Sequence, residues 1–510
     1  MTSSSSNPSL VLFVLGALLL VCLHSTLSAR EKRKKYPPGP PPKFLIGNLL
    51  DLPGKRLGQT YLEHGRRLGS DIVHVSALGN HVIVANTREV AEELLEKRAR
   101  NSSGRPWFAM TKMLDWEYNI AAMDYGDEWR KHRKVCQQHF NRVAAKSFQP
   151  IQLQKTRRML VGLLRFPEKF MLHNRMHSLS ISMDFLFGYQ IDTLDDPAIL
   201  AANKSLDIGN PLFTVNGSLI TVFPFLARVP AWVPGAISQK RAAEGRYWTH
   251  EMKRIPLEDV RRRMDEGRAT PSLVSQLLEK KNTVGIADED EQIMNNVAFT
   301  VYGAASDTTI SVTNTFFYAM SLHPEVQAKA QAEIDRIVGT HRLPEFSDRS
   351  SMPYIEAIYR EVMRYGPPVP LGVMHTLAED DYYRELSQVF ANIWAMTHDE
   401  NVYKDPDTFN PDRFLTEDGE LNDDDRVLAY GFGRRICVGK HVASSTTWIT
   451  IVSLLACINI GKAKDEFGNE IEVNREYDDD GLLVHKQPFK CSIVPRSEVA
   501  RKLIEEAALN

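Results

Sequence analysis

Hydrophobic residues recur at helical spacing over most of the chain, and strand-like alternation is confined to short stretches. The longest apolar pattern covers residues 291–322 and stops before a proline, which predicts a long helix through the interior. Pro324 suits the first turn of a following helix, and a third helix is predicted over about 354–364. Residues 71–75 and 81–85 alternate like strands around a Gly-Asn turn and predict a β-hairpin. The pattern therefore predicts a mainly α fold with a minor antiparallel β part and no alternating βαβ units.

The amino terminus has the pattern of a membrane anchor. Residues 10–23 are apolar, and no Lys, Arg, Asp or Glu appears before Arg30, which gives the ~20 residues that a transmembrane helix needs. The basic cluster at 30–35 predicts that the body of the protein faces the cytosol. A cleaved signal peptide is the alternative, because the apolar length also suits one. A stiff proline-rich spacer follows at 37–42. The predicted organisation is an anchor at 1–29, a basic and proline-rich linker at 30–44, and one catalytic domain at 45–510.

Composition narrows the functional class. With 43% hydrophobic residues, the chain of 510 residues is too apolar to be disordered. Its 62 Lys and Arg nearly cancel its 64 Asp and Glu, so no overall field favours binding to nucleic acid. The five cysteines form no CxxC pair, which argues against a zinc module or a disulfide scaffold.

One cysteine lies in a setting that suits a metal ligand. Residues 430–439 read YGFGRRICVG, and an apolar helical pattern follows over 441–455. The glycines allow the backbone to approach a flat ligand closely, and the arginines and helix start near Cys437 predict a stabilised thiolate. The stretch lacks the third glycine of a dinucleotide loop and the spacing of a phosphate-binding loop.

This stretch resembles the haem-binding loop of the cytochrome P450 family. The resemblance implies that Cys437 is the axial thiolate ligand of haem b iron and that Arg435 pairs with a haem propionate. It also implies a cytochrome P450 fold, mainly α with small β sheets, after a single N-terminal transmembrane helix. Tyr430 stands where the family usually has Phe, and its added hydroxyl group needs a hydrogen-bond partner.

The predicted central helix carries Gly-Ala-Ala-Ser-Asp-Thr-Thr at 303–309, which is similar to the family's oxygen-activating segment. Small side chains leave space over a reactive centre, and Asp307 and Thr308 are suited to relay protons through water. Ala305 replaces the more usual glycine, and its methyl group is expected to narrow the oxygen groove.

Two further signatures complete the resemblance. Glu361 and Arg364 match the family's Glu-x-x-Arg motif, and Arg413 lies in a segment that supplies a second arginine; these three residues are expected to interlock beneath the haem loop. Trp129 and Arg133, four residues apart on one helical face, resemble the segment that hydrogen-bonds a propionate. His375 is a further candidate to contact a haem propionate.

The chain departs from the family pattern at residues 384–389. Members usually have a longer hairpin here with Pro and Gly turn residues, which RELSQV does not supply. The departure predicts lost sheet pairing beside the haem. A splice variant, a gene-model error and an impaired enzyme are the three interpretations that it leaves open.

The resemblance implies a haem-thiolate monooxygenase that uses O2 and electrons from NADPH-cytochrome P450 reductase at the endoplasmic reticulum membrane. Residues 104–141 look like fungal members that decorate secondary metabolites, so a small lipophilic substrate, a terpenoid intermediate, is expected. The expected pocket segments are 107–120, 300–304 and 369–373, and the expected reductase contacts are Arg130, Lys131, Arg434 and Lys440. The alternatives are a haem-thiolate isomerase or dehydratase, and a haem-binding protein inactivated by the shortened hairpin.

Overall fold

The computed structural model describes residues 36–44, 46–213, 218–379, 387–479 and 481–507. The predicted anchor lies outside these residues. Among the helices of the described ranges, none combines the length and the apolarity needed to cross a membrane.

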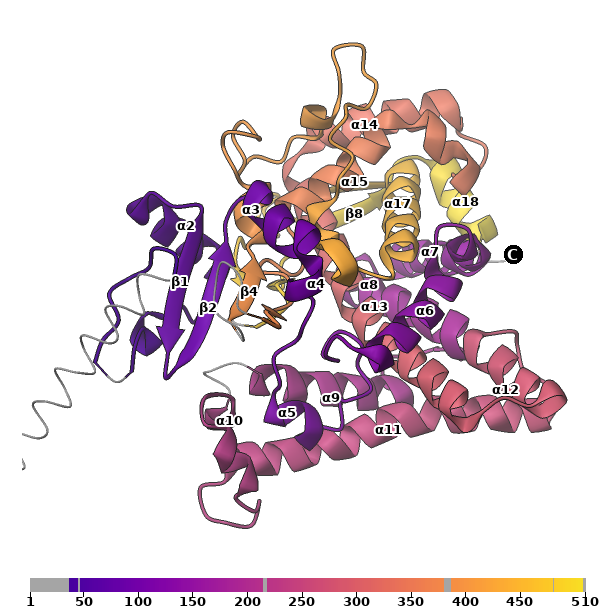
Figure 1. Ribbon diagram of the computed structural model, residues 1–510. Helices are drawn as coiled ribbons and strands as arrows, with labels where there is room; N and C mark the ends of the chain where they lie inside the picture. Colours follow the sequence, from indigo (N-terminus) through magenta and orange to yellow (C-terminus); the bar gives the residue numbers. More distant parts are fainter. Residues whose placement is uncertain (1–35, 45, 214–217, 380–386, 480, 508–510) are drawn as a thin grey trace, which may run out of the picture.

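Helices form most of the described chain, as predicted, and Figure 1 shows them surrounding α13. The longer helices are α2 (Leu57–Leu68), α6 (Asp127–Phe140), α7 (Gln149–Arg165), α8 (Phe170–Phe187), α9 (Pro197–Leu212), α11 (Ile237–Asp265), α12 (Leu273–Val284), α13 (Asp288–Leu322), α14 (Pro324–Ile337), α15 (Pro353–Tyr365), α17 (Lys440–Cys457) and α18 (Glu498–Ala507). The shorter helices are α3 (Arg88–Glu92), α4 (Ala99–Ser102), α5 (Ala109–Met113), α10 (Leu219–Val222) and α16 (Ile393–Thr397).

The predicted central helix is confirmed as α13, which ends at Leu322 before α14 begins at Pro324. Its carboxy-terminal half is buried on nearly every face because it packs against α8, α15 and α17. Phe316 and Phe317 of α13 join Trp448 of α17 in the largest hydrophobic cluster. This packing fixes α13 and α17 against each other. Helix α13 carries the predicted oxygen-activating segment, and α17 follows the predicted cysteine ligand.

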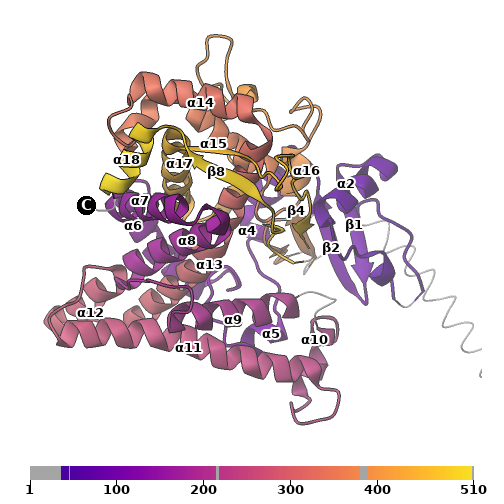
Figure 2. The same cartoon turned by 180° about the vertical axis from the view of Figure 1, so that it is seen from behind.

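The strands form small sheets. They are β1 (Ile72–Ala77), β2 (Asn80–Ala85), β3 (His375–Thr376), β4 (Gln388–Ala391), β5 (Ile458–Lys462), β6 (Tyr477–Asp478), β7 (His485–Lys486) and β8 (Cys491–Pro495). The predicted hairpin is confirmed, since β1 and β2 pair antiparallel from Ile72 opposite Ala85. Figures 1 and 2 show this hairpin with α2 at one end of the molecule and α9, α11 and α12 along another side.

The sheet beside the shortened segment corrects two expectations. Residues 380–386 lie outside the described ranges, but β4 begins at Gln388, one residue beyond Ser387, and pairs on both sides. It runs parallel to β2, with Val84 opposite Phe390, and antiparallel to β3, with His375 opposite Val389. The β part is therefore not purely antiparallel, and the predicted loss of sheet pairing is wrong for the described residues.

Candidate active site

The loop before α17 places Cys437 at the amino end of that helix. Gly433 has a φ of 56° and packs so tightly that a Cβ atom there would come within 2.0 Å of the Leu95 carbonyl oxygen. Only glycine fits this backbone geometry. The loop closes where the Cys437 amide donates a hydrogen bond to the Tyr430 carbonyl oxygen, at 2.9 Å.

The electrostatics of Cys437 correct one expectation. Burial raises the pKa of the thiol, although the Gly439 amide and the charges of Arg133 and Lys440 oppose that rise. The protein alone therefore favours the thiol, and the predicted preference for a thiolate is wrong without a bound cation. A bound metal ion would supply the positive charge that stabilises the thiolate, because coordination to a metal deprotonates a thiol. Cys437 as a residue is nevertheless exposed, so its sulfur stays within reach of a ligand even though the surrounding protein removes part of its hydration.

The structure brings Trp129, Arg133 and Arg435 together. Trp129 is buried on α6, and the guanidinium carbons of Arg435 and Arg133 lie 4.5 and 5.8 Å from the centroid of its ring system. Arg435 Nε donates to the Ser103 carbonyl oxygen at 2.8 Å, whereas its buried Nη2 has no hydrogen-bond partner among the described residues. An unpaired, buried guanidinium nitrogen is costly unless an anion meets it.

Arg105 belongs to the same cationic cluster and was missed by the sequence analysis. It is 8% exposed, and it donates to the carbonyl oxygens of Ala121 at 2.7 Å and Met374 at 2.6 Å. Burial, together with the nearby charge of Arg435, lowers the pKa of Arg105. In the sequence, Arg105 is distinguished only as a basic residue between a glycine and a proline, before an apolar stretch. That pattern is a weak signal for a functional residue.

His375 completes the cluster. Burial, together with the charges of Arg105 and Arg435, lowers its pKa to about 3, so the imidazole is neutral. Its Nδ1 lies 2.7 Å from the Ser102 carbonyl oxygen, a contact that requires Nδ1 to donate. The cationic side chains of Arg105, Arg133 and Arg435 thus meet near Cys437 with the neutral His375 beside them, and the two carboxylates of a haem would offset their charge.

The structure places Asp307 and Thr308 next to each other on α13, but their side chains have different partners. Thr308 Oγ1 donates to the Ala304 carbonyl oxygen at 2.9 Å, one turn earlier, and Ala304 is exposed although it lies in the middle of α13. The Asp307 carboxylate is 3.1 Å from Nε2 of His485 on β7. Thr308 therefore lies beside an accessible stretch of α13, while Asp307 is linked to another element.

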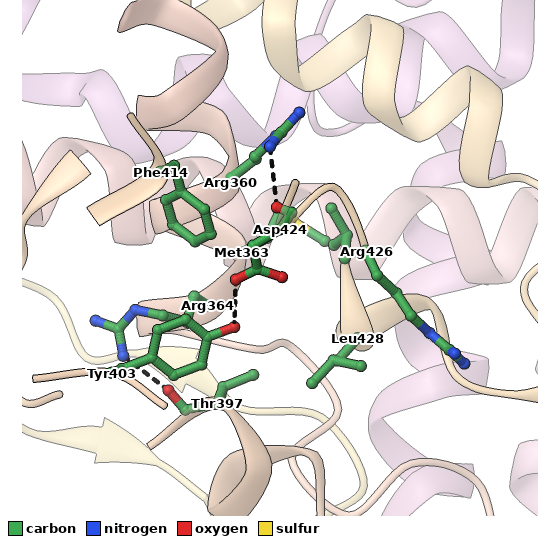
Figure 3. A pocket seen from close by; sticks show the side chains of 10 residues that line it. Arg360, Met363, Arg364, Thr397, Tyr403, Phe414, Asp424, Arg426 and Leu428 are labelled. Atoms are coloured by element: carbon green, nitrogen blue, oxygen red, sulfur yellow. Dashed lines mark hydrogen bonds between the residues drawn. The ribbon is translucent and has the colours of Figure 1, made fainter. Parts of the chain in front are cut away.

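Glu361, Arg364 and Arg413 form one buried ion network. Arg364 donates twice to the Glu361 carboxylate, at 2.6 and 2.8 Å, and Arg413 Nε lies 3.2 Å from the same carboxylate. Arg364 also donates to the Thr397 carbonyl oxygen at 2.8 Å. Figure 3 shows Arg364 and Thr397 lining a small pocket that Leu428, shortly before the Cys437 loop, also lines. The network thus braces the protein behind that loop.

The predicted reductase contacts are mostly engaged within the chain. Arg130 pairs with Asp127, Lys131 pairs with Glu289, and Arg434 Nη1 donates to the Tyr125 hydroxyl group at 2.7 Å. Arg434 nevertheless remains exposed, and no salt bridge of the described part of the chain neutralises it. It is the clearest candidate for a contact with a partner.

The structure thus assembles a cysteine at the amino end of a helix, a cluster of arginines beside it, and an accessible stretch of helix with an alcohol. This set of side chains fits a haem with a thiolate ligand. The comparisons agree. The family described as Cytochrome P450 matches residues 37–466. The chain is 38% identical over 505 residues to cytochrome P450 monooxygenase 98 of Postia placenta, covering 97% of this chain and 96% of that protein.

It is also 36% identical over 514 residues to cytochrome P450 monooxygenase ple1 of Rhodocybe pseudopiperita, covering 99% of this chain and 98% of that protein. It is 31% identical over 508 residues to tryptamine 4-monooxygenase of Psilocybe cyanescens, covering 97% of this chain and 100% of that protein. The chain belongs to the cytochrome P450 family. Its class is accordingly that of haem-dependent monooxygenases, which use O2, a small substrate and a redox partner.

Proposed function

We propose that this protein is a fungal haem-thiolate monooxygenase that oxidises a lipophilic intermediate of secondary metabolism, of the terpenoid class. Near full-length similarity to fungal monooxygenases supports the reaction class. The single observation that carries the site is the cluster of Arg105, Arg133 and Arg435 beside Cys437, which fits the iron ligand and the two carboxylates of a haem. The proposal includes an amino-terminal membrane anchor at residues 1–29 and a location at the endoplasmic reticulum.

Apolar side chains support a lipophilic substrate. Met110, Ile120 and Leu371, from the expected pocket segments, are buried, whereas Trp107 is 72% exposed and is not part of an interior lining. Thr300 Oγ1 accepts from the Ile120 amide and donates to the Tyr118 carbonyl oxygen, both at 3.2 Å. These bonds hold two of the pocket segments against each other, so the pocket wall is built before substrate binds.

In the proposed mechanism, a haem bound at this site would supply the iron at which O2 is activated. Cys437 would ligate the iron of the haem, and its propionates would be held by Trp129, Arg133, Arg435 and Arg105. Thr308 presents a hydroxyl group on the accessible side of α13, and Asp307 carries protons toward it from its contact with His485. The network of Glu361, Arg364 and Arg413 is structural.

The function is tested by co-expressing the full chain with NADPH-cytochrome P450 reductase in a host fed candidate terpenoids. A product heavier by one oxygen atom that requires both NADPH and O2 is expected. Product formed without NADPH would identify an isomerase or dehydratase instead. A protein that binds haem but yields no product from any candidate would support the inactive haem-binding alternative.

Asp307→Asn is expected to lower NADPH-driven product formation on the order of 10²-fold, because a general acid is removed. Turnover driven by hydrogen peroxide is expected to fall much less, since the peroxide brings its own protons with its oxygen. Asp290→Asn, in the exposed first turn of the same helix, is the matched control. Equal losses in both assays would contradict a role for Asp307 in proton delivery.

Arg434→Glu is expected to slow reductase-driven turnover several-fold, because it reverses an exposed charge beside the Cys437 loop. The effect is expected to weaken at high salt, whereas peroxide-driven turnover is unchanged. Arg262→Glu, on the distant helix α11, serves as the control. A reductase-driven rate equal to that of the unaltered protein would exclude Arg434 from the docking surface.

A further inference from the structure

The β6–β7 hairpin holds a histidine against α13. His485 of β7 lies opposite Asp478 of β6, and its Nε2 is 3.1 Å from the Asp307 carboxylate. The side chains of Asp307 and His485 are 26% and 30% exposed, so the protein covers the pair only in part. A histidine in this position can exchange protons with water at one ring nitrogen while the other nitrogen contacts the carboxylate. The hairpin therefore gives Asp307 a route to the protons of the solvent.

Two hydrogen bonds fix β7 beside α13. The Ser311 hydroxyl group of α13 donates to the Val484 carbonyl oxygen at 2.5 Å, and the Val484 amide donates to the Pro368 carbonyl oxygen at 3.0 Å. Ser311 lies one turn beyond Asp307 on the same helix. The residue directly before His485 is thus bonded to the helix that carries its partner, which sets the position of the imidazole along α13.

The residue directly after His485 is a buried lysine in an aromatic cage. Lys486 is 3% exposed, and its ammonium nitrogen lies 4.4 Å from the centroid of the Tyr318 ring and 4.3 Å from that of Tyr477. The same nitrogen donates to the Glu476 carbonyl oxygen at 2.7 Å. Burial lowers the pKa of Lys486 to about 8, so the group is still mainly charged near pH 7 and is attracted to both rings. Because Tyr318 belongs to α13 and Tyr477 to β6, the cage joins the hairpin to the helix.

We propose that Lys486 and its cage hold the hairpin so that His485 is the group through which Asp307 recovers its proton. The proposal rests on the proposed role of Asp307 in proton delivery. In each turnover, protonated His485 gives its Nε2 proton to the Asp307 carboxylate and becomes neutral, and it then takes up a proton from water. Lys486 does not touch Asp307, so it acts as a positioning residue for His485.

A small cavity is the competing entrance for protons. Asp307 lines it between α8, α9 and α13, together with a second acid, Asp207. Two carboxylates repel each other unless one of them is protonated, so Asp207 does not hold Asp307 in place. His485 carries the opposite charge when it is protonated, and it meets Asp307 directly. The geometry therefore favours the hairpin as the entrance.

His485→Gln keeps a side-chain nitrogen that donates to the carboxylate, but the amide cannot take up a proton. NADPH-driven product formation is expected to fall about tenfold and to become more sensitive to heavy water, whereas peroxide-driven turnover is unchanged. His323→Gln is the matched control, because His323 also faces a carboxylate, that of Glu325 at 2.9 Å, but directly follows the last residue of α13.

Three results would overturn the proposal. The first is a His485→Gln protein with the rate of the unaltered protein. The second is a lower rate without a larger effect of heavy water, which would show that His485 only supports the fold. The third is a loss of NADPH-driven product formation in Asp207→Asn alone, which would place the proton entrance in the cavity.

Lys486→Met keeps the length of the side chain and removes its charge. It is expected to lower NADPH-driven product formation several-fold, because the hairpin loses its attraction to the two rings. Lys329→Met is the matched control, since the Lys329 ammonium nitrogen lies 4.4 Å from the centroid of the Tyr354 ring in another part of the fold. Equal rates for Lys486→Met and Lys329→Met would refute the role of the cage.

The contact between His485 and Asp307 is also measurable without turnover. Nitrogen NMR of the haem-loaded chain with isotope-labelled histidine, reduced and bound to carbon monoxide, is expected to show a shifted His485 Nε2 signal in Asp307→Asn. The signal is expected to stay in place in Asp290→Asn, in the first turn of the same helix. An unshifted signal in Asp307→Asn would overturn the proposal. Failure of the proposed role of Asp307 is separately visible, because Asp307→Asn would then lower NADPH-driven and peroxide-driven turnover equally.

Discussion

Cys437→Ser is expected to abolish the red-shifted Soret band of the reduced, carbon monoxide-bound protein and all NADPH-driven turnover. The serine hydroxyl group is a harder and less basic donor than a thiolate, so it cannot replace the sulfur as an electron-donating ligand. The cationic cluster of Arg105, Arg133 and Arg435 is unchanged in this variant. We therefore expect some haem to remain bound while the spectrum changes completely.

The pH dependence of haem loading gives a second readout of the same group. Burial raises the pKa of Cys437 above its ordinary value, so the protein without haem holds a proton on the sulfur. Ligation must release that proton, and the affinity for haem is therefore expected to rise with pH below the pKa of the thiol. The dependence is expected to disappear in Cys437→Ser.

Cys136→Ser is the matched control, because Cys136 is a second buried thiol whose pKa is also raised by burial. The variant is expected to keep the red-shifted band and the pH dependence of loading. A Cys437→Ser protein that retained the thiolate spectrum would refute the assignment of the ligand.

The sequence was sufficient where structure is set by neighbours in the chain. The helical spacing of apolar residues and the position of Pro324 predicted α13 and the start of α14. The glycines before Cys437 predicted a loop whose backbone makes close approaches, as Gly433 does to Leu95. The contact of Glu361 with Arg364 and Arg413, which lie 3 and 52 residues away, was expected only from the resemblance to the family and not from the local pattern.

Features that depend on distant segments were not predictable in this way. The pairing of β2 with β4 joins residues about 300 apart, and its parallel direction follows from the path of the chain between them. His485 meets Asp307 although the two residues are 178 positions apart in the sequence, and nothing in the local sequence of His485 indicates an acidic partner. Arg105 acquires its significance only when Arg435 is placed beside it.

Glu361→Gln is expected to destabilise the protein by about 3–5 kcal/mol, the cost of leaving a buried charge without its partner. Glu361 is completely buried and neutralises both Arg364 and Arg413, so its loss leaves two guanidinium groups facing a neutral amide. The midpoint of urea unfolding of the haem-loaded protein, followed by circular dichroism, measures the effect. The folded fraction is expected to keep the thiolate spectrum, because the triad does not contact the iron ligand.

The control is an ion pair of similar geometry at the surface. Arg496 donates twice to Asp335, at 3.1 and 2.7 Å, but the Asp335 side chain is 40% exposed. Asp335→Asn is therefore expected to cost no more than about 1 kcal/mol. If the two variants unfold at the same urea concentration, burial adds nothing to the Glu361 network and its structural role is refuted. A large loss in Glu361→Gln alone would show that Arg364 and Arg413 require this carboxylate as their counter-ion.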